Sequence, residues 1–376
     1  MNALKLFALS FKKNLFSFIL VILEISALLI AENYMICTLN EREMLNAAYY
    51  PVLTENSAFV YDMGSFYSED TFRESRQKLL EKIPQNYKIY DTILYSNGDI
   101  SVISVSDEIY GNLKLPLSYG SYGDLSGGAV ATVNTKTGEN NVVFDDGSIL
   151  SLNVCGLLTY ATYLPEITSN ISNEMTVSDF YINSINDKNI ILTSRSAIKG
   201  FEDKFSCAPG FIIEFSENAE DNLLQLNKSK AMTVNASKII TNSNNALSKD
   251  KASFLPLVMS IGIVVVIGIV CISVIVFKEN ERRNAVLWIC GYSRAGLIGV
   301  HTAGTALVTA LSVIISLAAF GIMKLSGNEM LIGINLTIEN LVATFMTCAL
   351  LSAISAVVPA LKCRKASPAE YIRRAL

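Results

Sequence analysis

Four long apolar stretches, one near the N-terminus and three in the last third of the chain, bracket about two hundred mostly polar residues. Each stretch is long enough to cross a bilayer, which takes roughly 20 apolar residues in a helix. The polar segment between the first two must then lie wholly on one side of the membrane. We expect an α-helical membrane protein with four transmembrane helices, arranged one plus three, and a large lateral domain. The predicted division is 1–13 N-terminal tail, 14–36 first span, 37–253 lateral domain with stalk segments, 254–277 second span, 278–294 loop, 295–323 third span, 324–336 short loop, 337–361 fourth span and 362–376 tail.

Basic residues indicate which side is which, because short segments rich in Lys and Arg stay in the cytoplasm. Segments 1–13, 278–294 and 362–376 together hold 12 basic and 3 acidic residues, whereas 37–253 holds 17 basic and 27 acidic residues. We predict a multi-pass protein of the cell (plasma or inner) membrane, with both termini cytoplasmic and the lateral domain extracytoplasmic. The basic inner segments would also meet anionic membrane lipids. A cleaved signal peptide is the alternative for the first span, although its apolar run is longer than a signal requires.

The lateral domain has the pattern of an α+β fold with mixed sheets. Short runs rich in β-branched and aromatic residues predict strands, and the turn sequences at 96–99 and 145–147 predict two hairpins. Segments 71–83 and 217–228 are predicted helices, the first of them ended by Pro84. The predicted strands are 57–61, 87–95, 100–105, 141–144, 148–154, 189–193 and 211–215.

Two segments join the lateral domain to the first two spans. Residues 37–48 and 237–253 are polar but compatible with helix, so they either extend the spans outward as a stalk or form flexible linkers. The asparagines at 242–245 count against the stalk, because Asn is a poor helix former.

The sequence lacks the residues that several enzyme classes need. It has no Gly-x-x-x-x-Gly-Lys-[Ser/Thr] phosphate loop, so the chain is not an ATPase by that route. Its only histidine, His301, falls inside the third span, which excludes a Ser-His-Asp triad and a His-rich zinc site in the lateral domain. A hydrolase built on a pair of carboxylates stays open, although nothing in the sequence selects one, and we expect no metal site and no nucleic-acid partner. Cys155 and Cys207, the cysteines well inside the lateral domain, form either one disulfide or two free thiols.

An ionisable residue interrupts the first span. Glu24 lies 11 residues after Lys13, roughly 16 Å along a helix and close to the bilayer midplane. A charge at that depth is costly and usually faces protein or a water-filled cavity. Glu24 is therefore either a contact in a conduit or subunit interface, or a protonated carboxyl bonded to a neighbouring helix.

The cytoplasmic loop predicts a short helix with an apolar surface. Charged residues come first, then an apolar run at 285–290, and then Gly291. Glycine is the residue that most often follows a helix end. An apolar surface on this side needs lipid headgroups or a partner protein to cover it.

This loop resembles the coupling segment of FtsX/MacB-type ABC transporter permeases, the mechanotransmission or type VII class. Their pattern runs roughly Glu-Arg-x-x-Glu-Ile-x-x-Leu-basic-x-x-Gly-x-Ser. The matching residues are Glu279, Leu287, Gly291 and Ser293, and the departures are Asn280, Arg283, Asn284 and Trp288. The tail at 366–373 resembles the closing Ala-x-x-Pro-x-Glu-x-Leu-Arg of the family through Pro368, Glu370 and Arg373.

The resemblance implies a non-catalytic permease subunit with no cofactor of its own, working as a homodimer or heterodimer. It would contact a separate ABC ATP-binding protein that carries ATP and magnesium. Motion driven by ATP would pass to the outer domain, for peptide, lipoprotein or drug export or for cell-envelope regulation, with a peptide or protein partner outside. In this hypothesis Val286, Leu287 and Trp288 enter the ATPase, and Glu279 and Arg282 form the polar rim. The alternatives are a membrane-anchored receptor or binding protein without an ATPase partner, and an assembly factor.

Overall fold

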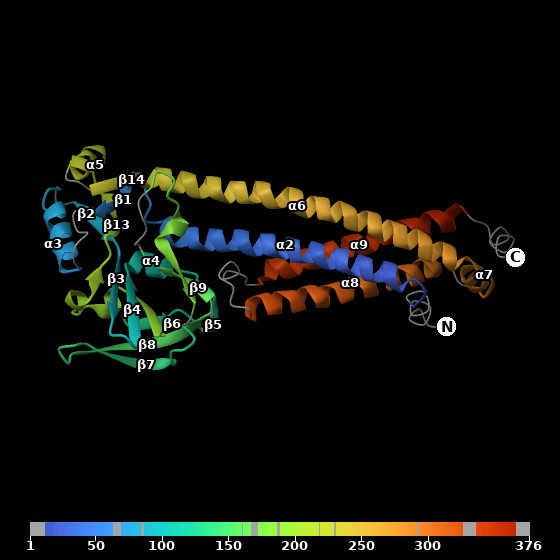
Figure 1. Cartoon of the computed structure of the whole chain (residues 1–376), viewed down its shortest axis with the longest axis horizontal. Coiled ribbons are helices and arrows are strands. Elements are labelled where there is room, and N and C mark those ends of the chain that lie inside the picture. Colours follow the sequence, from blue (N-terminus) through green and yellow to red (C-terminus); the bar gives the residue numbers. More distant parts are fainter. Residues whose placement is uncertain are drawn as a thin grey trace. The chain divides into compact units, whose positions relative to one another are not determined.

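The fold consists of two compact units (Figure 1). The structure is a computed structural model in which the described residues are 12–62, 69–83, 86–159, 161–166, 172–185, 189–217, 219–228, 231–291, 293–325 and 336–365. One unit, here the helical unit, takes its residues from 1–38, 251–326 and 334–376. The other, here the α+β unit, takes its residues from 39–250 and 327–333.

Four long helices form the helical unit, and a short helix joins two of them. Each long helix contains an apolar segment of sufficient length to cross a membrane, as the sequence predicts. These helices are α2 (Leu15–Tyr49), α6 (Ala236–Glu279), α8 (Arg294–Leu325) and α9 (Ile338–Lys365), and the short helix between α6 and α8 is α7 (Glu281–Ile289). The first residues of α6 and the last residues of α2 belong to the α+β unit.

The core of the helical unit takes most of its residues from α2 and α6, together with Val308 of α8 and Leu351 of α9. Ile25 and Leu29 of α2 and Val265 and Ile269 of α6 are fully buried in it. Many apolar side chains on the other faces of the long helices are exposed instead, among them Phe16 of α2 and Ile338 of α9. A helix that is apolar on its outward face as well as its inner face suits a lipid environment.

Polar side chains tie α2 to α9 within the helical unit. The Asn33 amide donates to Thr344 Oγ1 at 2.9 Å, and the Asn340 amide donates to Asn33 Oδ1 at 3.0 Å. One turn away, Thr347 Oγ1 donates to Glu32 Oε1 at 2.9 Å. Hydrogen bonds of this kind hold helices together where the surroundings offer no competing water.

The α6 helix has a proline in its interior, Pro256. Proline has no N–H to donate to the carbonyl four residues earlier, and its ring crowds that turn of helix.

The asparagines at 242–245 lie within α6 and do not interrupt it. The Asn242 amide donates to the carbonyls of Asn173 and Met175 at 3.0 and 3.1 Å. Ser243 Oγ accepts from the Val177 backbone N–H at 2.9 Å. The expectation that these residues weaken the helix was wrong, because their side chains bind a neighbouring segment of the α+β unit rather than competing with the helix backbone. Residues 37–48 are likewise helical, as part of α2.

The α+β unit contains two main sheets and a small hairpin. The antiparallel four-stranded sheet has the order β14-β1-β13-β2, and the large mixed sheet runs β12-β3-β4-β11-β6-β8-β5, with β7 also paired to β8. In the large sheet, β11 is parallel to β4 and β6 is parallel to β8. The strands are β1 (Ser57–Asp62), β2 (Tyr87–Tyr90), β3 (Thr92–Ser96), β4 (Ile100–Val105), β5 (Leu117–Gly120), β6 (Gly128–Ala131), β7 (Gly138–Val143), β8 (Ile149–Leu158), β9 (Ala161–Pro165), β10 (Tyr181–Ile185), β11 (Asn189–Ser194), β12 (Ser206–Cys207), β13 (Gly210–Phe215) and β14 (Ala231–Asn235).

Short helices flank these sheets. They are α3 (Glu69–Leu80), α4 (Asp107–Asn112), α5 (Ala219–Lys228) and the 3₁₀ turns η2 (Val177–Phe180), η3 (Ser196–Ile198) and η4 (Glu202–Lys204). The two helices predicted from the sequence correspond to α3 and α5, although α5 begins two residues later than predicted.

Both predicted hairpins are present. Strands β3 and β4 pair with Ser96 opposite Ser101, and β7 and β8 pair with Val143 opposite Ile149. Their turns contain Gly98 and Gly147, with φ of 91° and 80°. A left-handed backbone of this kind favours glycine, which explains why the turn sequences are good predictors.

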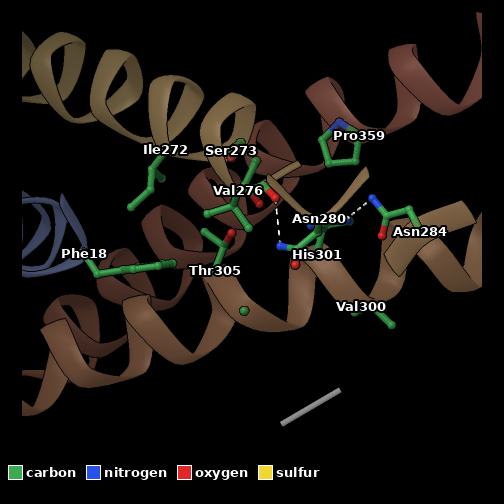
Figure 2. A pocket seen from close by; sticks show the side chains of 12 residues that line it. Phe18, Ile272, Ser273, Val276, Asn280, Asn284, Val300, His301, Thr305 and Pro359 are labelled. Atoms are coloured by element: carbon green, nitrogen blue, oxygen red, sulfur yellow. Dashed lines mark hydrogen bonds between the residues drawn. The ribbon is translucent and has the colours of Figure 1, made fainter. Parts of the chain in front are cut away.

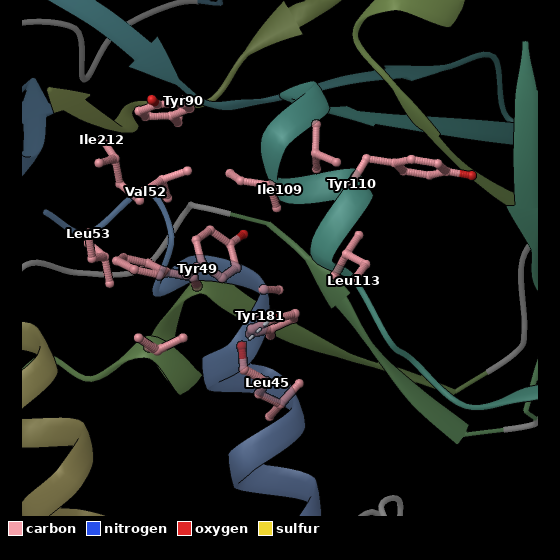
Figure 3. Packing of buried hydrophobic residues seen from close by; sticks show 14 of the residues in the cluster. Leu45, Tyr49, Val52, Leu53, Tyr90, Ile109, Tyr110, Leu113, Tyr181 and Ile212 are labelled. Carbon is pink, nitrogen blue, oxygen red and sulfur yellow. Dashed lines mark hydrogen bonds between the residues drawn. The ribbon is translucent and has the colours of Figure 1, made fainter. Parts of the chain in front are cut away.

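The end of α2 lies in the core of the α+β unit (Figure 3). Tyr49 is fully buried, with its ring 4.9 Å from that of Phe180 and 5.4 Å from that of Tyr181. The Tyr181 hydroxyl donates to the Leu45 carbonyl at 3.0 Å. This last turn of α2 is therefore anchored by packing, aromatic contacts and a hydrogen bond.

Asp91 occupies the point where the chain passes from β2 of the small sheet to β3 of the large one. Its carboxylate binds Arg76 at 2.8 Å and also accepts from Arg195. Its backbone N–H donates to Ser106 Oγ at 3.0 Å. The predicted strand 87–95 is thus two strands, and the acidic residue that divides them joins three separate segments.

Cys155 and Cys207 are free thiols. They lie on β8 and β12, which are five strand positions apart in the large sheet, or about 24 Å at the usual spacing between strands. A disulfide needs Cα atoms within about 7 Å. Of the two alternatives that the sequence left open, the fold supports the free thiols.

Candidate functional site

The short helix α7 is delimited at both ends by local chemistry. Asn280 precedes it, and its side-chain amide donates back to the Val276 carbonyl of α6 at 2.8 Å. Gly291 follows it with φ of 88°, and its N–H donates to the Trp288 carbonyl at 3.0 Å. Ser293 then caps α8, because its Oγ accepts from the Gly296 N–H at 3.1 Å. Gly291 and Ser293 of the predicted motif are therefore residues that shape the loop.

One face of α7 packs against the helical unit. Asn284 and Ala285 are buried, and Leu287 and Trp288 are half-buried. The apolar members of this face contact Phe277 at the end of α6 and the first turns of α8, notably Leu297. The Arg294 guanidinium lies 5.7 Å from the centre of the Trp288 ring. This inner face fixes α7 to the two helices that it joins.

A buried amide and the single histidine form the polar part of the inner face (Figure 2). Asn284 is only 4% exposed, and its Nδ2 lies 3.3 Å from His301 Nε2 on α8. The His301 ring in turn packs on Phe277, with 5.1 Å between ring centroids. Asn284 and His301 line a small cavity of about 50 Å³. The interaction therefore connects α7 directly to α8.

The opposite face of α7 is open. Arg282 and Arg283 are exposed, and so are Val286 (58%) and Ile289 (65%). Positions 282, 286 and 289 are spaced i, i+4 and i+7, which places them on one side of a helix. The outward face, defined by these four residues, therefore combines two cations with a pair of branched apolar side chains.

This arrangement differs from the predicted partner contact at two residues. Val286 points outward as the hypothesis requires, whereas Leu287 and Trp288 are half-buried against the helical unit, and Ile289 accompanies Val286 instead. Because six successive positions from 285 to 290 are apolar or small, the sequence alone does not distinguish the two faces.

Glu279 and Arg282, the predicted polar rim, have different surroundings. Glu279 is the last residue of α6, and its carboxylate pairs with Lys13 Nζ at 3.4 Å and accepts from the Asn14 amide. Arg282 is exposed on the outward face. Glu279 thus links α6 to the start of α2 and is not part of the outward face. The polar border of the apolar pair on that face is formed by its two arginines.

Asn280 and Asn284 are site residues that sequence reasoning missed. Both are departures from the pattern that the loop resembles, and both side chains are buried, Asn280 directly before α7 and Asn284 within it. Their spacing of i, i+4 places them on one helix face, next to the only histidine of the chain. That spacing is the signal that would have indicated a polar contact under the helix.

Glu24 lies against a glycine of α6. A Cβ added at Gly268 would overlap the Glu24 carboxylate, so the absence of a side chain there makes room for it. Glu24 Oε2 is buried and has no hydrogen-bond partner among the described residues. The bond to a neighbouring helix that one alternative required is therefore not formed by this oxygen.

We expect Glu24→Gln to preserve the folded helical unit and Glu24→Lys to destabilise it. Glutamine has nearly the same shape and no charge, whereas a lysine at a helix centre costs about 3 kcal/mol on membrane insertion and is longer than the space beside Gly268. Thermal unfolding of the two purified variants in detergent, each against wild type, measures the difference. Equal and normal stability of both would show that the carboxyl is incidental.

A second pair of variants checks the contact itself. Gly268→Ala introduces the overlapping Cβ and is expected to destabilise the chain by about 1–3 kcal/mol. Glu24→Ala should restore part of this loss in the double variant, because it removes the group that the new methyl meets. Additive effects would mean that the two residues do not touch.

Three further predicted residues, Pro368, Glu370 and Arg373, lie outside the described residues. Within the described part of the chain, no group of three or more His, Cys, Asp or Glu side chains is placed to hold a metal ion.

Comparison with known proteins gives little beyond these observations. No family model and no curated protein matches the sequence. Among solved structures, the chain is similar to the crystal structure of the periplasmic region of MacB from Actinobacillus actinomycetemcomitans, at 13% identity and a TM-score of 0.24. The alignment covers 52% of this chain and 95% of that one. A TM-score of this size does not establish a shared fold, so what the chain does has to follow from its own helices and side chains.

Proposed function

We propose that this chain is a membrane-embedded permease subunit of an ABC transporter, which transmits the ATP-driven motion of a separate ATP-binding protein to its extracytoplasmic α+β unit. The observation that carries the proposal is the outward face of α7. A nine-residue helix is held firmly on one side and presents an uncovered apolar pair, bordered by arginines, on the other. Exposed apolar groups with a polar rim are typical of protein contact sites.

The inner face of α7 supports transmission of force. A partner that presses on Val286 and Ile289 displaces a helix whose other side is bonded to α6 through Asn280 and to α8 through Asn284. Because packed cores shift between discrete arrangements rather than deforming continuously, such a displacement passes to the attached helices.

The α6 helix supports the outward path of that motion. Its 44 residues correspond to about 66 Å of helix. Near its first turns, Asn242 and Ser243 hydrogen-bond the segment 173–177 of the α+β unit. Arg42 of α2 pairs with Asp250 of α6 in the same unit. A displaced α6 would therefore carry this segment and the end of α2 with it.

In the proposed assembly the chain itself is non-catalytic. The partner ATPase holds ATP and magnesium on the cytoplasmic side, where both termini of this chain also lie, and a second permease subunit, identical or different, completes the complex. The α+β unit would act outside the membrane, on a peptide, a lipoprotein, a drug or a protein of the cell envelope. Lipids surround the exposed apolar faces of the four helices.

Isolation of the native complex tests the proposal. We expect the tagged chain, solubilised in a mild detergent, to copurify with a stoichiometric protein that contains a phosphate-binding loop, as identified by mass spectrometry. The same experiment shows whether a second, different permease is present. If no such ATPase is found while other membrane complexes of the same cells remain intact, a membrane-anchored receptor becomes the better description.

A further inference from the structure

The only histidine of the chain lies where three helices meet (Figure 2). His301 belongs to α8, about two turns after the start of that helix. Its ring packs on Phe277 at the end of α6, and its Nε2 lies 3.3 Å from Asn284 Nδ2 of α7. Phe277 is fully buried and Asn284 almost fully. One imidazole therefore contacts both the helix that precedes α7 and α7 itself.

Hydrogen-bond chemistry assigns a role to each nitrogen of this ring. In a neutral imidazole one nitrogen accepts and the other carries the proton. The amide nitrogen of Asn284 can only donate, so His301 Nε2 has to accept and the proton lies on Nδ1. An imidazolium would instead present an N–H to the N–H of Asn284 and lose the bond. The ring also lines the cavity of about 50 Å³, which is large enough for a water molecule to accept from Nδ1.

The charged groups around the ring favour the same neutral form. Lys362 of α9 has its Nζ 5.7 Å from the centre of the Phe277 ring, on which the imidazole packs. Arg283 of α7 has its Nη1 3.4 Å from Oδ1 of Asn280, which lines the same cavity as His301. Among the described residues that line this cavity, none is acidic. A second proton on the ring would therefore add a positive charge near two others, with no carboxylate in the cavity to compensate it.

Asn284 lies opposite the apolar pair of the outward face. With 3.6 residues per turn, position 284 is roughly 170° around the helix from the middle of positions 286 and 289. The apolar contacts of the inner face hold α7 in place but are non-directional, whereas a hydrogen bond weakens steeply away from its preferred angle. A rotation of α7 that moves Val286 and Ile289 would therefore break the bond between Asn284 and His301.

We propose that His301 is the positioning residue of the outward face of α7, acting as a neutral imidazole with its proton on Nδ1 and its Nε2 accepting from Asn284. The proposal rests on the proposed function for its consequence, because that face is the one that would bind the ATPase. The protonation of the ring does not depend on any partner. The two proposals can therefore fail separately.

The position of the proton can be measured directly, because the chain has a single histidine. The full chain, without a histidine tag, is labelled with ¹⁵N in histidine alone and solubilised in detergent for nuclear magnetic resonance. At neutral pH we expect a protonated Nδ1 and an unprotonated Nε2, distinguished by their couplings to the ring protons. Asn284→Ala should shift the Nε2 resonance, because it removes the donor. A proton on Nε2, or on both nitrogens, would overturn the proposal.

Two substitutions of the histidine test the consequence for α7. His301→Gln keeps an acceptor, its side-chain oxygen, at a similar reach, whereas His301→Leu has similar bulk and no acceptor. Hydrogen–deuterium exchange of the backbone of 281–290 should be faster in His301→Leu and close to wild type in His301→Gln. His301→Leu should also bind the proposed ATPase about tenfold more weakly, and His301→Gln should remain within about twofold of wild type.

Thr302→Val is the matched control. Thr302 is the next residue of α8, and its hydroxyl donates to carbonyls of its own helix, Ile298 at 3.2 Å and Gly299 at 3.1 Å. This variant should leave the exchange of 281–290 unchanged.

The outcomes separate this inference from the proposed function. If His301→Gln exchanged as fast as His301→Leu, or if His301→Leu exchanged like wild type, His301 would not position α7. The nitrogen measurement needs no substitution of His301, so it decides the matter even where His301→Leu fails to fold. If the resonances and the exchange were as expected but no ATPase bound the wild-type chain, the proposed function alone would be overturned.

Discussion

The double variant Val286→Asp, Ile289→Asp is expected to insert and fold normally and to lose the proposed ATP-hydrolysing partner. Both side chains are exposed, so their replacement should change the stability of the chain by no more than about 0.5 kcal/mol. In an interface, however, the apolar contacts of both side chains would be lost and two carboxylates would have to be desolvated, and central contacts of this kind contribute about 2 kcal/mol or more each. We expect the partner to bind at least about a hundredfold more weakly, measured by titration of the purified subunit with the ATPase.

The matched control keeps both positions apolar. Val286→Leu, Ile289→Leu should retain the partner and the stimulated ATP hydrolysis. Leu287→Asp offers an informative contrast, because Leu287 packs inside with Phe277 and Leu297. We expect that variant to lose the partner as well, but with a lower unfolding temperature of the helical unit. Normal partner binding by a correctly inserted Val286→Asp, Ile289→Asp chain would contradict the assignment of the outward face.

Asp91→Ala is expected to destabilise the α+β unit by about 3 kcal/mol, because it leaves a buried arginine without its counter-ion. Arg76 is 8% exposed, and its guanidinium carbon also lies 4.2 Å from the centre of the Phe211 ring. The substitution also removes the partner of Arg195. Urea unfolding, followed by the fluorescence of tyrosines in the α+β unit, measures the loss.

Two further variants distinguish charge from packing at this position. Asp91→Asn keeps a hydrogen-bond acceptor but removes the charge, so its loss should be smaller than that of Asp91→Ala. Arg76→Met in the Asp91→Ala background removes the uncompensated cation and should restore part of the stability. If Asp91→Ala were no less stable than wild type, the junction between the two sheets would not depend on this carboxylate.

Local chemistry accounts for the parts of the fold that the sequence predicts well. To predict a membrane-spanning helix, it is enough to find a sufficiently long run of apolar residues. To predict a tight hairpin turn, it is enough to find a glycine at the position where φ is positive. Each requirement is met within a few residues, as at Gly98 and Gly147. The identity of a strand's neighbour is not local. Strand β6, four residues long, pairs with β11 and with β8 from later in the chain, and its composition of glycine, alanine and valine gives no alternation to detect.

The same distinction applies to the candidate site. The existence of a short helix after α6 and its end at Gly291 follow from charge, hydropathy and one glycine. The orientation of that helix depends on Asn284 meeting His301, 17 residues later on another helix. From the sequence alone, neither Asn284 nor His301 indicates which residue it contacts. The face that α7 presents outward therefore had to come from the structure.

Pro256 sets a depth for α6 in a bilayer. Its missing N–H leaves the carbonyl of residue 252 without the usual helical donor, and an unsatisfied carbonyl is costly in hydrocarbon but not in the headgroup region, where water is available. In the proposed orientation, that turn should therefore lie at the outer boundary of the hydrocarbon. Counting about 20 residues inward for a core of about 30 Å reaches the fully buried Phe277 and then Lys278 and Glu279, the first charged residues after the span. Pro256 at one end and the charges of Lys278 and Glu279 at the other would then fix the position of α6 along the bilayer normal.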